Sequence, residues 1–320
     1  MAVQSMVQQA TNNRPATNGI KGFNNLINSN IMRAKITQMV GATDSQEFIT
    51  SITSAVNTNP TLAECDSQTI ISAALLGQSL HLKPSPQLGY FYMVPFNNRK
   101  KGCKEAQFQI GYKGYLQMAI RTNEYVDIDA TVIRQGEYKG RNKLTGKPEF
   151  EFIEDDGVAE NLPVVGYMAY FEMKNGYIKR IYWSKEKMEK HADTYSAAFN
   201  LKTFHLLQEG KIPQEDLWKY SSFWYKNFDE MAKKTMLRQL LSKHALLSTE
   251  LAKAIESDQA VIDENLNPHF EDENVIDANA VEKEAQQQIE ATTAPTMESI
   301  IKEEKQTEAV PVDDFDPMSM

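Results

Sequence analysis

Apolar residues recur at helical spacing in the first third of the chain. Residues 48–56 carry them three or four positions apart, which predicts an amphipathic helix. Thr43 and Gln46 have the spacing of a capping box at its start, and Asn59-Pro60 stops it. A second helix is predicted around residues 66–80, where apolar side chains cover so wide an arc that we expect the helix to be buried.

After these helices the pattern changes to runs rich in aromatic and β-branched residues. Residues 82–89 contain two prolines and a glycine, which cannot continue a helix. The strands that follow are separated by turn signals such as Lys174-Asn175-Gly176, a strong hairpin sequence. A short helix is expected after Gly111. The predicted strands are residues 90–96, 106–110, 126–138, 149–153, 164–173 and 177–183.

The last part of the pattern is helical again. Ser184 is in position to cap a short helix, residues 194–216 are interpreted as a loose connection, and a long amphipathic helix is predicted over residues 221–247. The fold class that follows is α+β, with N-terminal helices, a mostly antiparallel β-meander and a long C-terminal amphipathic helix.

Charge divides the chain into unequal parts. The formal net charge is −9, but residues 256–320 hold 18 acidic and 3 basic side chains, which leaves 25 acidic and 31 basic in residues 1–255. The body is therefore basic, which favours a partner with phosphate charge, and the acidic end has the composition of a disordered segment. We predict a flexible arm at residues 1–22, a core at 23–256 and a disordered acidic tail at 257–320.

Composition also bears on where the chain works. Its Gln-, Asn- and Thr-rich start has no apolar run that could form a signal-peptide core, and no segment approaches the roughly 20 apolar residues that cross a bilayer. Cys65 and Cys103 are too few for a disulfide scaffold and match no zinc spacing. We therefore expect a soluble cytoplasmic protein with reduced thiols and without a bound metal or other cofactor.

Two predicted hairpin tips are densely basic. Clusters of this kind neutralise phosphates and release counterions, which gives an affinity for nucleic acid that is independent of sequence and falls with salt. The alternative is that both tips are ordinary solvated turns. The first tip holds Arg99, Lys100, Lys101 and Lys104, and the second holds Lys139, Arg141, Lys143 and Lys147.

The long predicted helix places four cations within one arc at about 100° per residue. A helix packed on the core by its opposite face would present these cations outward in a row. Three leucines at positions 237, 240 and 241 enter the same arc, which indicates that the far end is more buried. The alternative is that the charges only solubilise an exposed face. The four cations are Lys226, Lys233, Lys234 and Arg238.

Aromatic residues interleave with cations in two places. One is Tyr112-Lys113-Gly114-Tyr115, and the other is Phe223-Trp224-Tyr225-Lys226. Bases stack on aromatic rings without regard to sequence, so a groove with both kinds of side chain suits nonspecific binding of a single strand. Tyr112 and Tyr115 are the candidates for stacking, and the alternative for each is a place in the core.

Signatures of catalysis are sparse. The loop of residues 140–148 has one residue too many between its glycines for a phosphate-binding loop, and a proline where magnesium needs Ser or Thr. ATP hydrolysis is therefore not expected, and the histidines show no metal-binding spacing. Asp155 or Asp156, with Glu172 and Lys174, loosely matches the acid and Glu-x-Lys arrangement of magnesium-dependent nucleases, which stays open as an alternative.

Several segments resemble the RecT family of phage and prophage single-strand annealing proteins, in order across about residues 55–245. Two of them are specific motifs: one contains Gly111-Tyr112-Lys113-Gly114 and the other contains Met231-Ala232-Lys233-Lys234. The departures are modest, since Ser85 stands where a glycine is common and Gln239 stands where an arginine is frequent. The similar segments are residues 59–66, 77–84, 88–96, 109–114 and 229–235.

The resemblance implies an ATP-independent protein that binds single-stranded DNA, forms homo-oligomeric rings or filaments on it, anneals complementary strands into duplex, and works beside a phage exonuclease. By residue matching, it implies that Lys113, Lys233, Lys234 and Arg238 face the DNA. A host single-strand-binding protein is a second candidate partner, and Asp313-Asp314-Phe315-Asp316-Pro317 looks a little like the tail of such a protein. The remaining alternative is an adaptor that binds such a tail without touching DNA.

Overall fold

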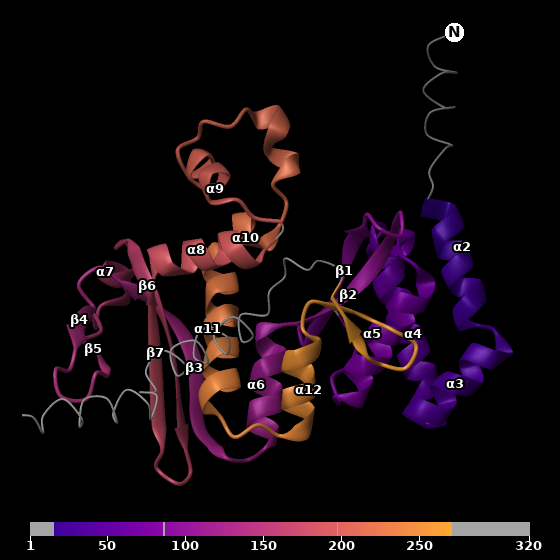
Figure 1. Cartoon of the computed structure of the whole chain (residues 1–320), viewed down its shortest axis with the longest axis horizontal. Helices are drawn as coiled ribbons and strands as arrows, with labels where there is room; N and C mark the ends of the chain where they lie inside the picture. Colours follow the sequence, from indigo (N-terminus) through magenta and orange to yellow (C-terminus); the bar gives the residue numbers. More distant parts are fainter. Residues whose placement is uncertain (1–15, 86, 197, 271–320) are drawn as a thin grey trace, which may run out of the picture. The chain divides into compact units, whose positions relative to one another are not determined.

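The computed structural model describes residues 16–85, 87–196 and 198–270, and Figure 1 traces their course. All of them fall within residues 1–273, one of the two units into which the chain divides. Residues 1–15 of the predicted arm and residues 271–320 of the predicted tail lie outside the described residues. Residues 16–22, which we expected to belong to the flexible arm, are helical. The fold class is α+β, as predicted.

The N-terminal region is helical, as the apolar spacing predicts. The first predicted helix ends at Thr58, directly before Asn59-Pro60. Its capping box does not form, because Asp44 takes the N-cap position without a side-chain cap bond. In the second, the Asp66 carboxylate caps the helix by accepting from the Gln68 backbone N–H, and most of the helix is buried. The elements are α2 (Ala16–Ile27), α3 (Asn30–Val40), α4 (Ser45–Thr58), η1 (Leu62–Glu64) and α5 (Ser67–Ser79).

The first sheet has the strand order β1-β2-β8-β9, and α5 packs against it. Its third strand lies in the stretch that we expected to be disordered tail. All three residues of this strand are buried, and two of them pair with β2, because the short apolar run Ala-Val-Ile completes the sheet. The tail prediction is therefore wrong for residues 257–270. The strands are β1 (Phe91–Asn98), β2 (Cys103–Ile110), β8 (Ala260–Ile262) and β9 (Pro268–His269).

The second sheet is an antiparallel meander with the order β3-β6-β7. Asn175-Gly176 forms the predicted hairpin turn between β6 and β7, with Gly176 at φ 81°. Residues 126–138, expected as one strand, are interrupted by a turn at Gly136, φ 94°, and the chain then forms the separate β4–β5 hairpin. The strands are β3 (Tyr125–Arg134), β4 (Tyr138–Arg141), β5 (Pro148–Phe150), β6 (Val164–Met173) and β7 (Ile178–Ser184).

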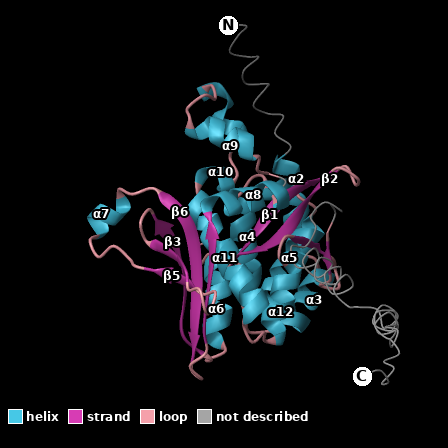
Figure 2. Ribbon diagram, turned by 60° about the vertical axis from the view of Figure 1, so that its left-hand side comes forward, coloured by secondary structure: helices cyan, strands magenta, loops and turns pink. Residues whose placement is uncertain are grey.

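Helix α11 (Phe228–His244) lies between the second sheet and the helices α6 (Tyr112–Arg121) and α12 (Thr249–Ser257) (Figure 2). The long helix that we expected over residues 221–247 is broken at Asn227, φ −139° and ψ 58°, so a short helix, α10 (Phe223–Lys226), precedes α11. Among the helices of the described ranges, none has the length and apolar character that a membrane span requires.

Residues 194–216 are more ordered than the loose connection that we expected. Ser184 caps the helix before them, as predicted, by accepting from the Lys187 backbone N–H at 3.2 Å. Beyond it, Phe199 and Phe204 pack with the aromatic side chains of α10 and α11, which gives this segment an apolar core. The segment contains α9 (Leu201–Gln208) and the start of η2 (Gln214–Lys219). The helices before it are α7 (Asp156–Glu160) and α8 (Lys185–Tyr195).

Candidate nucleic-acid interface

The Gly-Tyr-Lys-Gly motif forms the N-terminal turn of α6. A methyl group added at Gly111 would lie 2.1 Å from the Gly89 carbonyl oxygen, and one added at Gly114 would lie 2.0 Å from the Tyr90 carbonyl oxygen. The two glycines therefore let the start of α6 pack directly on the backbone of the preceding loop. Gly111 is the N-cap residue and offers no side chain to the first N–H groups, which carry the positive end of the helix dipole.

Lys113 is exposed at this helix start. Its side chain passes beside Gly89, and the hydroxyl of Tyr92, which is itself exposed, approaches the same glycine. A cation, a helix N-terminus and an aromatic ring thus share one place on the surface. We did not predict Tyr92 as a site residue. Tyr92 pairs with Gln109, and Gln109 lies two residues before Gly111. The antiparallel pairing of the two predicted strands is therefore the signal that could have identified Tyr92.

Tyr112 joins the start of α6 to the second sheet. Its hydroxyl donates to Asp129 Oδ1 at 2.5 Å and accepts from the Ala130 backbone N–H at 3.3 Å. Partial burial and the hydrogen bond to Asp129 raise the pKa of the phenol, and the Glu230 carboxylate adds to the effect. Glu230 in turn pairs with Lys233 Nζ at 2.6 Å. The N-terminal ends of α6 and α11 are therefore neighbours, with Lys113 in the first turn of α6 and Lys233 in the second turn of α11.

Tyr115, predicted as a stacking residue, is completely buried. Its hydroxyl donates to Asp258 Oδ2 at 2.9 Å. Burial raises the pKa of the phenol well above its usual value, and the Asp258 carboxylate raises it further. The ring cannot reach a base in this conformation, so the stacking prediction for Tyr115 is corrected. Its spacing four residues before Ala119 on the inner face of α6 explains the burial.

Two of the four cations of the predicted row face the interior. Only 12% of the Lys234 side chain and 20% of the Arg238 side chain are exposed, and both approach the buried Asp258 carboxylate, at 4.0 Å from Lys234 Nζ and 3.6 Å from Arg238 Nε. Burial lowers the pKa of Lys234, and the Asp258 charge opposes that effect. The expectation that both cations face solvent is wrong, because α12 and the Asp258 that follows it lie against the arc of α11 that a helical projection leaves open.

Asp258 is the centre of this buried cluster. Besides the two cations and Tyr115, it accepts a hydrogen bond from the Ile110 backbone N–H at 2.8 Å. The carboxylate thus links α11, α6 and β2 to the segment between α12 and β8. The far end of α11 is buried as predicted. The leucines there are Leu237, Leu240 and Leu241, and all three are fully enclosed.

The cations at the other predicted positions stay on the surface. Lys226 is exposed at the end of α10, next to Trp224, which is buried. At the β1–β2 turn Arg99 is exposed, whereas Lys101 Nζ pairs at 2.8 Å with Glu105, a buried carboxylate. Lys101 therefore has a local partner that helps to fix the turn.

The β4–β5 hairpin carries the densest exposed charge of the predicted sites. Lys139 pairs with Glu151 at 3.0 Å below the tip. Arg141, Lys143 and Lys147 surround the tip, and within the described residues none of the three forms an ion pair. The second basic hairpin that the sequence predicts is thus present and open to a ligand.

The alternative nuclease site does not assemble. The Asp155 carboxylate caps α7 by accepting from the Val158 backbone N–H, and Lys174 Nζ donates to Asn123 Oδ1 at 2.7 Å. Among the residues that the structure describes, no group of three acidic, histidine or cysteine side chains is close enough together to hold a metal ion. The geometry gives the nuclease hypothesis no support.

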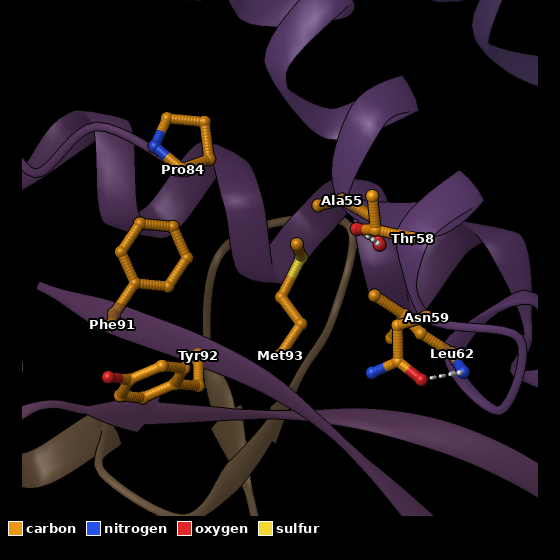
Figure 3. Close-up of a pocket in the computed structure, with 8 residues that line it drawn as sticks. All are labelled: Ala55, Thr58, Asn59, Leu62, Pro84, Phe91, Tyr92 and Met93. Atoms are coloured by element: carbon orange, nitrogen blue, oxygen red, sulfur yellow. Dashed lines mark hydrogen bonds between the residues drawn. The ribbon is translucent and has the colours of Figure 1, made fainter. Parts of the chain in front are cut away.

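A cavity of about 320 Å³ lies between α4 and β1 (Figure 3). Its lining is mostly apolar. Asn59 Oδ1 accepts from the Leu62 backbone N–H, and the Thr58 hydroxyl donates to the Ser54 carbonyl. It therefore offers no catalytic constellation. The lining residues are Ala55, Thr58, Asn59, Leu62, Pro84, Phe91, Tyr92 and Met93.

Comparison with known proteins gives one consistent result. The model of the RecT family matches residues 46–293. The chain is 31% identical over 284 residues to the uncharacterized protein YqaK of Bacillus subtilis (strain 168), with 88% of each chain covered. It is 27% identical over 218 residues to Protein RecT of Escherichia coli (strain K12), which covers 67% of this chain and 71% of that protein.

Proposed function

Because this chain belongs to the RecT family, whose members are single-strand annealing proteins of recombination, we propose that it binds single-stranded DNA and pairs complementary strands without nucleotide hydrolysis. The observation that carries the proposal is the start of α6. Lys113 stands exposed there beside Tyr92, at a helix N-terminus whose cap residue is a glycine. Backbone N–H groups and a cation at one point suit a phosphate.

In this proposal the surface cations bind the phosphates of the DNA strand and leave its bases free. Phosphate contacts position a strand without reading its sequence, so a second strand is checked by base pairing alone. No bond to the protein forms or breaks, and the reaction needs no metal and no cofactor. The residues to which we assign phosphate contacts are Lys113, Lys226, Arg99, Arg141, Lys143 and, after exchange of its Glu230 partner, Lys233.

Lys234 and Arg238 have an indirect role in this proposal. Through Asp258 they hold the inner face of α6, whose outer end carries Lys113. They are therefore positioning residues, and Tyr115 and Lys101 also act within the fold. Tyr112 keeps its hydroxyl on Asp129, so we assign it to fixing the edge of β3 beside the binding surface.

Family membership also supports the partners that we propose. The chain would assemble as a homo-oligomer on DNA in the cytoplasm and work beside a phage exonuclease that exposes the strands, with a host single-strand-binding protein as a second partner. A further hypothesis is that the acidic tail competes with DNA for the basic surface, and removal of residues 271–320 tests it. A deletion from residue 257 would also remove Asp258 and β8, which belong to the fold.

The test uses two complementary oligonucleotides labelled as a fluorescence donor and acceptor, mixed with the full chain in EDTA without nucleotide. We expect pairing faster than the spontaneous rate, and an affinity for either strand that falls steeply as salt rises. Pairing no faster than in the absence of protein would reject the proposal. Shortened strands on a denaturing gel in magnesium would favour the nuclease alternative, and absence of any complex with naked strands would favour the adaptor.

A further inference from the structure

The tip of the β4–β5 hairpin presents one apolar side chain among cations. Leu144 is 97% exposed, the largest exposure among the big apolar side chains of the described residues. Arg141 precedes it at the end of β4, Lys143 is its neighbour, and Lys147 leads into β5. A single exposed leucine is unremarkable by itself. This leucine differs from other exposed apolar residues because it stands at the apex of a positively charged turn.

The turn is held in one conformation by its own hydrogen bonds. Asn142 Oδ1 accepts from the backbone N–H groups of Leu144 and Thr145, both at 3.0 Å. The Asn142 backbone N–H donates to the Lys147 carbonyl at 2.8 Å, and the Arg141 guanidinium donates to the Gly146 carbonyl at 3.0 Å. Leu144 is therefore presented on an ordered turn, so little conformational entropy is lost when it meets a ligand.

The base of the hairpin is anchored to the second sheet. Tyr138 stacks on Tyr182 of β7, with ring centroids 4.2 Å apart and ring planes 19° apart. Phe150 meets the same tyrosine edge-on at 5.7 Å. These contacts fix the hairpin to a rigid element, so the tip can act on a ligand without the hairpin bending away.

The charges lie on both sides of the apex. Lys143 directly precedes Leu144, and beyond the apex lie Lys147 and the Arg141 guanidinium, which donates to the Gly146 carbonyl. Lys139, lower on the first arm, is already paired with Glu151. A single strand offers one phosphate backbone, whereas a double helix offers two, one on each side of a base pair. Cations on either side of an apolar apex therefore complement paired DNA better than a lone strand.

We infer that the β4–β5 tip is an apolar wedge that contacts the base stack of the annealed duplex, with Leu144 against a base step and Arg141, Lys143 and Lys147 on the flanking phosphates. Apolar side chains that enter a base step unstack it locally, and neighbouring cations hold the two backbones. The inference rests on the proposed function and adds to it a site for the paired product, distinct from the start of α6.

The test uses duplexes that carry 2-aminopurine at internal positions, one position per duplex, because this base fluoresces more strongly when it is unstacked. We expect the full-length protein to raise the fluorescence. The Leu144→Ala variant should lose most of that rise, several-fold at the responsive positions, with unchanged affinity for single strands. Leu144→Phe should retain the rise. Ile31→Ala removes a similarly exposed apolar side chain, 85% exposed on α3, and should change nothing.

Each other outcome overturns the inference. A rise of equal size with Leu144→Ala, or no rise with the parent protein at any position, would show that the tip does not enter the stack. A changed sedimentation coefficient of DNA-free Leu144→Ala, with its fluorescence rise intact, would assign the tip to a contact between copies. Failure of the proposed function is distinguishable, because end-labelled strands would then neither bind nor pair with any variant.

Discussion

The two basic clusters of the molecule differ in what surrounds them. Lys234 and Arg238 on α11 approach a carboxylate that has no exposed surface, and they share it with Tyr115. Arg141 and Lys143 surround a hairpin tip, and in the described part of the chain neither has an ion-pair partner. The positive charge of one cluster is partly compensated inside the fold, and the other cluster keeps its charge for a ligand.

The difference shows what decides whether a cation binds or supports. A buried cation costs several kcal/mol unless an anion and hydrogen bonds compensate it, and Asp258 supplies the anion to α11. A hairpin tip has no second layer over it, so its cations stay hydrated and release counterions only when phosphate arrives. Both places carry Lys and Arg, and the layer that covers α11 makes the difference.

The largest effect expected is that of Asp258→Ala, which breaks the comparison at its centre. The change leaves two buried cations without their anion and the Ile110 N–H and Tyr115 hydroxyl without their acceptor. Removal of one partner from a buried ion pair costs about 3–5 kcal/mol. We expect a loss of that size in the free energy of unfolding, measured by urea denaturation. If the variant does not fold, Asp258→Asn keeps the hydrogen-bonding shape and should lose less.

Glu256→Ala is the matched control, because Glu256 is an exposed acid two residues before Asp258. It should change the free energy of unfolding by no more than about 0.5 kcal/mol. Equal stability of the two variants would contradict the structural role of the cluster. An Asp258→Ala protein of normal stability with higher DNA affinity would instead identify Asp258 as a competitor of phosphate for Lys234 and Arg238.

Simultaneous replacement of the three tip cations by alanine tests the other half of the comparison. Each phosphate contact on duplex DNA contributes about 0.9 to the slope of log affinity against log salt, so we expect the slope to fall by about 3. The melting temperature should change little, because the three side chains are exposed. Fluorescence anisotropy across a salt series measures the slope. The replaced residues are Arg141, Lys143 and Lys147.

A control of equal charge change is available on the same protein. Three exposed lysines each pair with a nearby carboxylate, so their removal alters the net charge without opening a phosphate contact. The slope should then move much less than in the tip variant. An equal fall in both proteins would mean that overall charge, and not the hairpin, governs affinity. The control residues are Lys190, Lys211 and Lys219.

The features of the fold that could be predicted from the sequence are mostly those that the local residue pattern determines. The aromatic and β-branched run over residues 164–173 gave β6 with both ends correct. The start of α5 was expected at about residue 66, where Asp66 caps the helix, because capping needs only neighbouring residues. Asn175-Gly176 formed its turn for the same reason. Each of these features depends on interactions within a few residues.

What could not be predicted depends on distant partners. The burial of Lys234 requires Asp258, and nothing in the spacing of α11 shows that a later segment returns to cover it. The short run Ala260–Ile262 was assigned to the acidic tail because its neighbours are acidic, yet it finds β2 and becomes a strand. Tertiary contacts of this kind override local composition.

Lys113→Ala should produce a smaller effect than the tip variant. One contact with a single strand contributes about 0.7 to the salt slope, so the slope should fall by about that amount and the annealing rate should fall at moderate salt. The fold should be unaffected, because the side chain is exposed. Lys233→Ala is the informative companion, since its partner Glu230 already occupies it. A larger loss with Lys233 than with Lys113 would move the centre of the binding surface from α6 to α11.

The smallest effect expected separates two aspartates that stand five residues apart. Asp258 is buried with cations, whereas Asp263 is partly exposed in the β8–β9 turn, where the backbone N–H of Asn267 and the His269 ring lower its pKa to about 2. A carboxylate whose pKa is depressed by folding contributes stability above its unfolded value, near 4, and loses it as the pH falls toward 2. The melting temperatures of the parent and Asp263→Asn should therefore differ slightly near neutral pH and converge as the pH falls from about 4 to about 2. A gap that persists at the acid end would mean that the side chain acts through shape and not through charge, and the contrast with Asp258 would then rest on burial alone.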